Sequence, residues 1–377
     1  MPHHTLHLHH MRIIKSEIQE VYLNLLIQSF AFSLITIFIP IYLLKLGYSI
    51  NQALIFVMFE IGTLSFFSPF SAMLAKKYGF KHIILYRVPL LIVYFGGLYA
   101  LNYARIPLYP LAVTGGIAGS IYWVSLHSLF AKHSDKLHRG AQAGKMISIP
   151  NIAALFGPSI GGIIAIGLGF RVLIAAAMLL LIASTIPLFF TSDMKPHVVH
   201  FSLSDVFAKK RLKFLLAFAS QGTMAIAGTV IWPIFVYFTL NDVASVGFMT
   251  SMMTVGIILF TLYVGRISDR TSRFALMKIG GILMALTFFL RIYATDITRV
   301  FAVSFFAGMF TVLIDLPILA VFYDIANREN LTETVVLREI GLGIGRVCSI
   351  LVVLWVLNKF AVGFSLGGIA SLAFSLF

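Results

Sequence analysis

The sequence predicts an all-α membrane protein of twelve transmembrane helices, arranged as two pseudo-symmetric six-helix bundles. Only 11% of its 377 residues are charged, whereas 59% are hydrophobic. A soluble domain needs more charged residues than this on its solvated surface. Apolar runs of the roughly 20 residues that cross a bilayer core recur along the chain. Polar residues also repeat at a constant spacing between its two halves.

Twelve apolar runs define the predicted spans. We expect helices over 18–44, 51–75, 82–103, 107–131, 145–167, 170–191, 212–240, 244–265, 274–294, 298–323, 337–357 and 361–377. The longest polar connection separates the first six from the last six. The expected organisation is a cytoplasmic N-terminal tail (1–17), an N-terminal bundle (18–191), a cytoplasmic linker (192–211) and a C-terminal bundle (212–377).

The basic residues predict the orientation of these helices. The net charge of +14 would indicate nucleic acid as the partner of a soluble protein. Here most lysines and arginines fall in every second connection, on the side of the N-terminus, and such residues mark the cytoplasmic side. We therefore expect both termini in the cytoplasm of a plasma or inner membrane, with the lipid bilayer rather than nucleic acid as partner. We also expect a monomer. The one cysteine, Cys348, forms no intrachain disulfide.

The first eleven residues carry His3, His4, His7, His9 and His10. A metal-sensing tail is one interpretation of this segment. The alternatives are a disordered leader, a remnant of cloning, or a start assigned too early, before Met11. The segment lacks the apolar core and cleavage site of a signal peptide.

The two halves are related by an offset of 193 residues. It places Gln28 on Gln221, Thr36 on Thr229 and Pro40 on Pro233. Glutamine, threonine and proline are uncommon in apolar spans, so their coincidence indicates a duplicated unit. Duplicated helical halves in a membrane commonly enclose a transport path.

The same offset aligns two charged turns. One runs from Gly265 through Asp269 and Arg270 to Arg273, and Lys76-Lys77 is its counterpart in the first half. The turn resembles the loop signature of the major facilitator superfamily. The segment from Gly157 to Gly162, which contains Pro158, Gly161 and Gly162, is similar to a signature of the drug–proton antiporter branch of that superfamily. The resemblance implies two six-helix bundles around a central cavity, lined mainly by the first, fourth, seventh and tenth helices, that opens alternately to each side.

The chain departs from this family pattern in two places. Lys76 and Phe80 stand where the first-half loop expects an aspartate and a basic residue, and no arginine precedes Gly115-Gly116 on the fourth helix. The unequal loops predict unequal cytoplasmic gates. We expect Asp269 to stabilise one gate through the N-terminus of the fifth helix and Lys145, and Lys76 or Lys77 to contact Glu339 at the other.

Four charged residues fall within predicted spans, where each costs about 2.5–3.5 kcal/mol at the centre. We expect Arg87 to extend to the cytoplasmic surface. Asp315 and Arg346 are on consecutive helices and predict an ion pair, either purely structural or broken and re-formed during transport. Glu60 is the candidate for proton coupling, because burial favours the neutral form of an unpaired carboxyl. The alternative is a permanently neutral, hydrogen-bonded Glu60 that packs the second helix on the eleventh.

Polar and aromatic residues on three helices are candidates for a substrate cavity. Asn24 and Gln28 share a helix face, and with Gln221 they are expected either to contact substrate or to hydrogen-bond between helices. Pro40 and Pro233 predict kinks. The remaining candidates, which core or interfacial packing would equally explain, are Tyr122, Trp123 and Trp232. His127 is interpreted as interfacial, with a proton relay as the alternative.

The glycines at 157, 161 and 162, with those at 341, 343 and 345, predict close helix packing at both seams between the halves. No set of residues with the spacing of an enzyme active site, a metal site or a phosphate loop stands out, so we predict neither catalysis nor a cofactor or metal. The leading hypothesis is a secondary transporter for a small organic solute, with proton-driven efflux as its more specific form. The alternative is a non-transporting membrane sensor or assembly partner that keeps the transporter fold.

Overall fold

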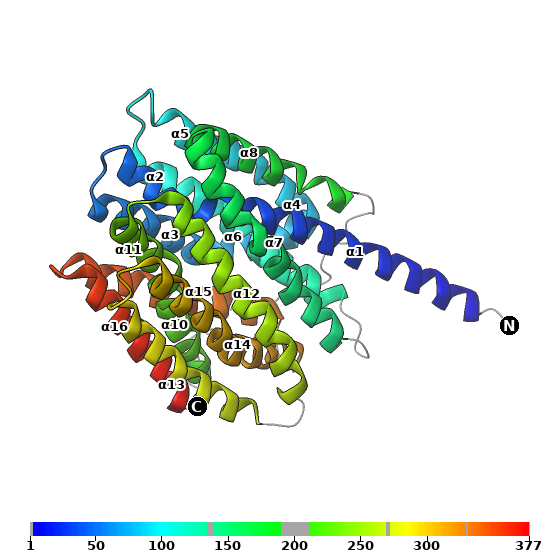
Figure 1. The fold of residues 1–377 in the computed structure, drawn as a ribbon. Coiled ribbons are helices and arrows are strands. Elements are labelled where there is room, and N and C mark those ends of the chain that lie inside the picture. The colour runs from blue at the N-terminus through cyan, green and yellow to red at the C-terminus, as the bar shows by residue number, and fades with distance from the viewer. Residues whose placement is uncertain (1–2, 134–138, 190–210, 269–271, 329–330, 377) are drawn as a thin grey trace.

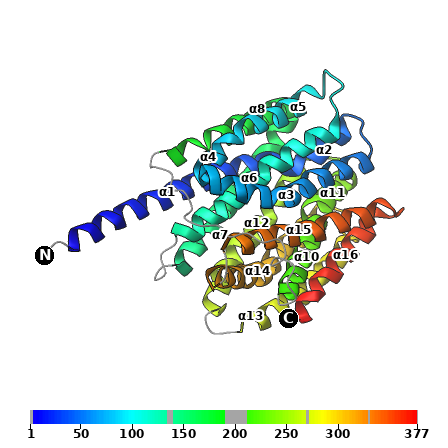
Figure 2. The same ribbon diagram turned by 180° about the vertical axis from the view of Figure 1, so that it is seen from behind.

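The computed structural model describes residues 3–133, 139–189, 211–268, 272–328 and 331–376, and within these ranges all the regular secondary structure is helical (Figure 1). The expected linker at 192–211 lies outside these ranges except for Arg211. The first helix begins at His3 and projects beyond the other helices (Figures 1 and 2). The tail, for which a disordered leader was one of the alternatives, is helical and continuous with the first span.

The N-terminal half contains six spans, several of them interrupted. They are α1 (His3–Ile35) with η1 (Thr36–Phe38) and α2 (Ile39–Lys45), α3 (Ile50–Tyr78), α4 (Phe80–Tyr86) with α5 (Val88–Ala100), α6 (Leu108–His133), α7 (Arg139–Gly167), and α8 (Phe170–Ala183) with η2 (Ile186–Phe189). A capping box at Ser49 starts α3, since its hydroxyl accepts from the Gln52 amide while the Gln52 side chain accepts from the Ser49 amide.

The C-terminal half repeats this order. Its spans are α10 (Leu212–Ile226) with a π-helical turn (Ala227–Ile231) and α11 (Trp232–Leu240), α12 (Val243–Ser268), α13 (Arg273–Arg291), α14 (Ile297–Arg328), α15 (Leu331–Leu354), and α16 (Lys359–Ala373) with η5 (Phe374–Leu376). In the described part of the chain, nine helices are long and apolar enough to cross a membrane, judged by length and composition only. The prediction of twelve spans in two six-helix halves is confirmed.

The internal repeat is visible as a shared kink. Thr36 donates to the Phe32 carbonyl and Thr229 donates to the Ala225 carbonyl, each at 2.8 Å. The two threonines are related by the offset of 193 residues. Each bond lies where the α-helix gives way to another helical turn, four residues before Pro40 or Pro233. Proline supplies no amide hydrogen to the preceding turn, and a threonine hydroxyl bonded to its own helix adds to the bend. The predicted kinks are therefore present in both halves.

Two long seams join the halves, α3 against α15 and α7 against α12. Small residues allow close approach there: a Cβ on Gly247 would lie 2.3 Å from the Pro158 carbonyl oxygen, and one on Gly162 would lie 3.1 Å from the Ala244 backbone. Gly157 and Gly161 do not belong to a seam, contrary to our expectation. They face Ser33 and Leu34 of α1, within their own half.

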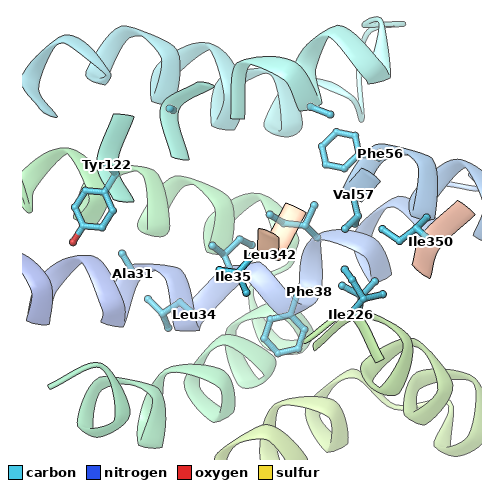
Figure 3. Packing of buried hydrophobic residues seen from close by; sticks show 14 of the residues in the cluster. Ala31, Leu34, Ile35, Phe38, Phe56, Val57, Tyr122, Ile226, Leu342 and Ile350 are labelled. Atoms are coloured by element: carbon cyan, nitrogen blue, oxygen red, sulfur yellow. The ribbon is translucent and has the colours of Figure 1, made fainter. Parts of the chain in front are cut away.

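The middle of the molecule is closed by apolar side chains from both halves. Ile35 and Phe38 of the first span lie beside Ile226 of α10 and Leu342 of α15 (Figure 3), and all four are at least 97% buried. We call the end of the bundle where α3 and α6 terminate and α15 begins the basic end. The halves touch there through α6 with α14 and α15, and at the opposite end through α2 with α11.

Candidate functional site

A cavity of about 340 Å³ lies between the halves, toward the basic end. Helix α7 of the first half and four helices of the second half line it. Its polar lining residues are Asn151, Gln221, Thr261, Thr311, Asp315 and Arg338. Phenylalanines and aliphatic side chains complete the wall, among them Phe218, Ile257, Leu316, Leu319 and Phe322. The cavity thus combines an apolar surface with a few hydrogen-bonding groups, as small-molecule sites do.

The carboxyl group in this cavity is held from two helices. Gln221 Nε2 of α10 donates to Asp315 Oδ1 at 2.8 Å, and Thr311 Oγ1 donates to Asp315 Oδ2 at 3.3 Å. Asp315 remains exposed to the cavity. Of these residues, Gln221 is a predicted cavity residue, whereas for Asp315 the sequence predicts a pair with Arg346.

The predicted ion pair between Asp315 and Arg346 is absent. No ion pair among the described residues joins them, and Arg346 does not line the cavity. Helices consecutive in sequence need not turn their charged residues toward each other, and the rotation of α14 directs Asp315 toward α10. Arg338, two turns earlier on α15, is the basic residue of the cavity wall.

A histidine bridges the halves at the basic end. His127 of α6 is buried, with Nδ1 3.4 Å from the Tyr323 hydroxyl and Nε2 3.3 Å from Arg338 Nη1. Arg338 also donates to Glu339 Oε1 at 2.8 Å. Neither Tyr323 nor Arg338 was among the predicted site residues. His127 lies at the interface between the protein halves rather than at the interface between membrane and water.

The predicted gate contacts take a different form. The hydrogen bond given to Glu339 comes from Arg338, and the Lys77 ammonium lies 5.0 Å from the ring centre of its neighbour Tyr78. The contact described for Glu339 thus comes from Arg338 of its own helix rather than from Lys77, and Arg338 also lies against His127. Asp269 and Arg270 of the second charged turn lie outside the described residues, and the side chain of Lys145 on α7 is not described, so the expected contact between Asp269 and Lys145 stays a prediction. Gly265 lies within α12. Arg273 pairs with Asp324 at 2.7 Å on the surface.

A second polar cluster lies inside the N-terminal half. Tyr122 donates to Asn24 Oδ1 at 3.1 Å, and Asn24 Nδ2 donates to the Ser184 carbonyl at 2.6 Å. Ser184 Oγ and Arg87 Nη2 both donate to Gln28 Oε1, at 2.8 and 2.5 Å. These residues are at most 1% exposed, so they join helices within the bundle and do not line the cavity described above.

Arg87 is the member of this cluster that sequence reasoning placed wrongly. It does not extend to the surface: it is fully buried, with its guanidinium 4.3 Å from the centre of the Tyr122 ring. The span breaks at Arg87, between α4 and α5, and Pro89 follows at the start of α5. Proline at the beginning of a helix is the signal in the sequence that marks this break.

Glu60 is hydrogen-bonded to the third span. Tyr94 of α5 donates to its carboxyl at 3.0 Å. Gly115 and Gly116 of α6 make room for this pair, since a Cβ on Gly115 would lie 2.6 Å from the Tyr94 ring and one on Gly116 would lie 2.3 Å from the Glu60 carbonyl oxygen. The hydrogen-bonded alternative therefore fits the geometry, although its partner is on the third span rather than the eleventh.

Trp232 packs in the core of the C-terminal half. It is fully buried, its indole donates to Ser304 at 3.0 Å, and Arg291 lies 5.1 Å from its ring centre. It lines neither the cavity nor a membrane interface. Trp123, half-buried on α6, stacks on His127 with ring centres 5.9 Å apart, which places it beside the contact between the halves.

Comparison with known protein families agrees with the helical architecture. The family model described as Major Facilitator Superfamily matches residues 21–208 and 213–377, one segment in each half. The chain belongs to the major facilitator superfamily. It is accordingly a multi-pass membrane transporter, from a family that moves solutes and is generally not enzymatic. A comparison with curated individual proteins finds no match.

Proposed function

We propose that this major facilitator protein is a secondary active transporter that moves a small organic solute by alternating access. The observation that carries the proposal is the cavity between the two halves, in which Asp315 is held by Gln221 and Thr311 but stays exposed. A volume of about 340 Å³ lies near the lower end of the range for small-molecule sites. The lining supports an amphipathic solute, whose apolar part packs on Phe218 and Phe322 and whose donor or cationic group meets Asp315.

Contacts across the halves support alternating access. Apolar side chains from both halves pack together in the middle of the molecule (Figure 3), and the His127 contacts join the halves at the basic end. The close-packed seams at Gly247 and Gly162 provide surfaces on which the halves rock. Breaking one set of contacts while keeping the other would expose the cavity to one side at a time.

Proton-driven efflux is the more specific proposal, and the chain offers two carboxyl groups for it. Glu60 is hydrogen-bonded to Tyr94 inside the N-terminal half, whereas Asp315 lines the cavity that we propose for the solute. Direct competition between proton and solute requires a shared site, so Asp315 fits this role better than Glu60. The excess of basic residues at the basic end supports placing both termini in the cytoplasm of a plasma or inner membrane.

The test is solute movement in proteoliposomes with and without a pH gradient, using a panel of amphipathic amines and neutral analogues. We expect at least one amine to move against its gradient when a pH gradient is imposed. Asp315→Asn should lose this coupling, Glu60→Gln should retain most of it, and Asp296→Asn should match the wild type, because Asp296 pairs with Arg299 on the surface. A folded protein that moves no member of the panel would favour the non-transporting sensor.

A further inference from the structure

The buried guanidinium of Arg87 has no carboxylate partner. Among the described residues no ion pair includes it, and its contacts are the Gln28 side-chain oxygen and the face of the Tyr122 ring. Two of its nitrogens, Nε and Nη1, are buried without a hydrogen-bond partner. An ionised group that is buried and incompletely bonded is strongly unfavourable, and proteins normally compensate such a group.

The unsatisfied atoms of the surrounding cluster are all donors. Gln28 Nε2 is also buried without a partner, whereas Gln28 Oε1 already accepts two hydrogen bonds and Asn24 Oδ1 accepts one. Gln28 Oε1 and the Leu181 carbonyl oxygen both lie within reach of the Ser184 hydroxyl, whose single hydrogen can be donated to one or shared between them. The cluster therefore contains three donor nitrogens without an acceptor, namely Arg87 Nε, Arg87 Nη1 and Gln28 Nε2. It also carries one positive charge without a negative partner.

The backbone around the cluster is interrupted in two spans. The third span breaks at Arg87, between α4 and α5, and the sixth ends its α-helix at Ala183, just before Ser184 and the η2 turn. Irregular backbone within a membrane is tolerated where it is buried in protein or lines a binding site, and interrupted spans recur at the binding sites of transporters. Both interruptions lie beside the same unsatisfied donors.

We infer that Arg87 and Gln28 form a binding site for a small monovalent anion within the N-terminal half. The guanidinium supplies the charge and two N–H groups, the Gln28 amide supplies a third donor, and the Tyr122 ring fixes the guanidinium plane. Guanidinium groups are well suited to binding oxyanions through charge-assisted hydrogen bonds. The cluster is completely buried, so we infer a ligand as small as chloride or formate, or the carboxylate end of a solute.

Arg291, the other fully buried arginine of a described span, has a different environment. Its Nη1 donates to the Ala227 carbonyl at the π-helical turn, and its guanidinium lies over the rings of Trp232 and Phe288 at 5.1 and 4.4 Å. No second side chain there presents an unsatisfied donor. The convergence of donors from two helices is what distinguishes the Arg87 cluster.

The test is thermal unfolding of the purified full chain at constant pH and ionic strength. The bulky 2-(N-morpholino)ethanesulfonate anion is replaced stepwise by chloride or by formate, all as sodium salts. Ligand binding to the folded state should raise the midpoint by about 2–4 °C, and the rise should saturate with concentration. A response to formate alone would assign the site to carboxylates, and a response to chloride alone would assign it to free halide. A midpoint that ignores both anions overturns the inference.

Two variants separate binding from a general effect of salt. Gln28→Glu places a carboxylate beside Arg87 with almost no change in shape, so it should raise the midpoint without added anion and abolish the response to either probe. Gln52→Glu is the matched control, because it makes the same chemical change at an exposed capping position of α3, away from Arg87, and it should keep the full response. A Gln28→Glu protein that responds like the wild type contradicts the site. The measurement involves no transport, so it is independent of the proposed function.

Discussion

Gln221 Nε2 donates to Asp315 Oδ1 at 2.8 Å and so ties α10 to α14 at the wall of the cavity. The same contact defines which substitutions the site tolerates. Gln221→Glu would set two carboxyl groups within hydrogen-bonding distance, and like charges at this separation cannot both ionise without strong repulsion. We expect this variant to be less stable at pH 8 than at pH 5 by about 1–2 kcal/mol, measured as the thermal midpoint in detergent.

Gln221→Leu is the control for this comparison. It removes the amide donor without adding a charge, so it should lower the midpoint by a similar amount at both pH values. A Gln221→Glu protein whose stability relative to Gln221→Leu is the same at pH 5 and pH 8 would show that the two side chains do not meet as described.

The contact between His127 and Tyr323 predicts an energetic coupling between the halves. Their side chains are 3.4 Å apart across the interface at the basic end. In a double-mutant cycle of His127→Ala and Tyr323→Phe, we expect a coupling of about 0.5–1.5 kcal/mol. The measurement is the thermal midpoint of the four proteins, converted to free energy with the unfolding enthalpy.

A second cycle controls for indirect effects. Ser159 donates to Ser251 at 2.7 Å across the seam between α7 and α12, away from His127 in the chain and in its contacts. Ser159→Ala and Tyr323→Phe should therefore be additive. Equal coupling in both cycles would mean that the halves respond as rigid bodies and that the His127 contact contributes nothing of its own.

The sequence allowed the spans, the two halves and the shared kinks to be predicted, because each depends on local properties. The length of an apolar run and the absence of an amide hydrogen on Pro40 and Pro233 act within one helix. Which side chains meet across two helices depends instead on how the helices are rotated against each other. The rotation of α14 sends Asp315 to Gln221 instead of Arg346, and no periodicity in an almost uniformly apolar helix reveals that rotation.

Arg87 illustrates the same limit more strongly. Its distance from the end of an ideal helix predicted that it would extend to the surface, but the span breaks at Arg87 itself and the side chain turns inward to Gln28. Pro89 marks this break in the sequence. His127 was misplaced for a related reason, because its partners lie on α14 and α15 of the other half, far away in the chain.

The packing of α6 against α3 predicts a sharp difference between two glycines. A Cβ on Gly116 would lie 2.3 Å from the Glu60 carbonyl oxygen, whereas one on Gly96 would meet nothing within 4 Å. Backbone atoms of a long helix do not yield easily, so Gly116→Ala should lower stability by about 1–3 kcal/mol. Gly96→Ala should be neutral or slightly stabilising. Similar midpoints for the two variants would contradict the close approach of α3 and α6.

A cap outside the membrane spans predicts a pH dependence at the opposite end of the bundle. Partial burial of Asp242 raises the pKa of its carboxyl, but hydrogen bonds from the Ser245 hydroxyl and from the amides of Ser245 and Ala244, with the charge of Lys45, together hold that pKa below its ordinary value of 3.8. A carboxyl whose pKa is lowered by folding stabilises the protein above its ordinary pKa, and this contribution is lost as the pH falls through the lower value of the folded state.

Asp242→Ala should therefore cost about 1 kcal/mol at pH 7 and less below pH 4. Asp242→Asn keeps the acceptor oxygen without a titrating charge, so its cap should contribute equally at both pH values. Thermal midpoints of the three proteins at pH 7 and pH 3.5 check this, and an Asp242→Ala deficit that is as large at pH 3.5 as at pH 7 would show that ionisation of Asp242 does not matter to the cap.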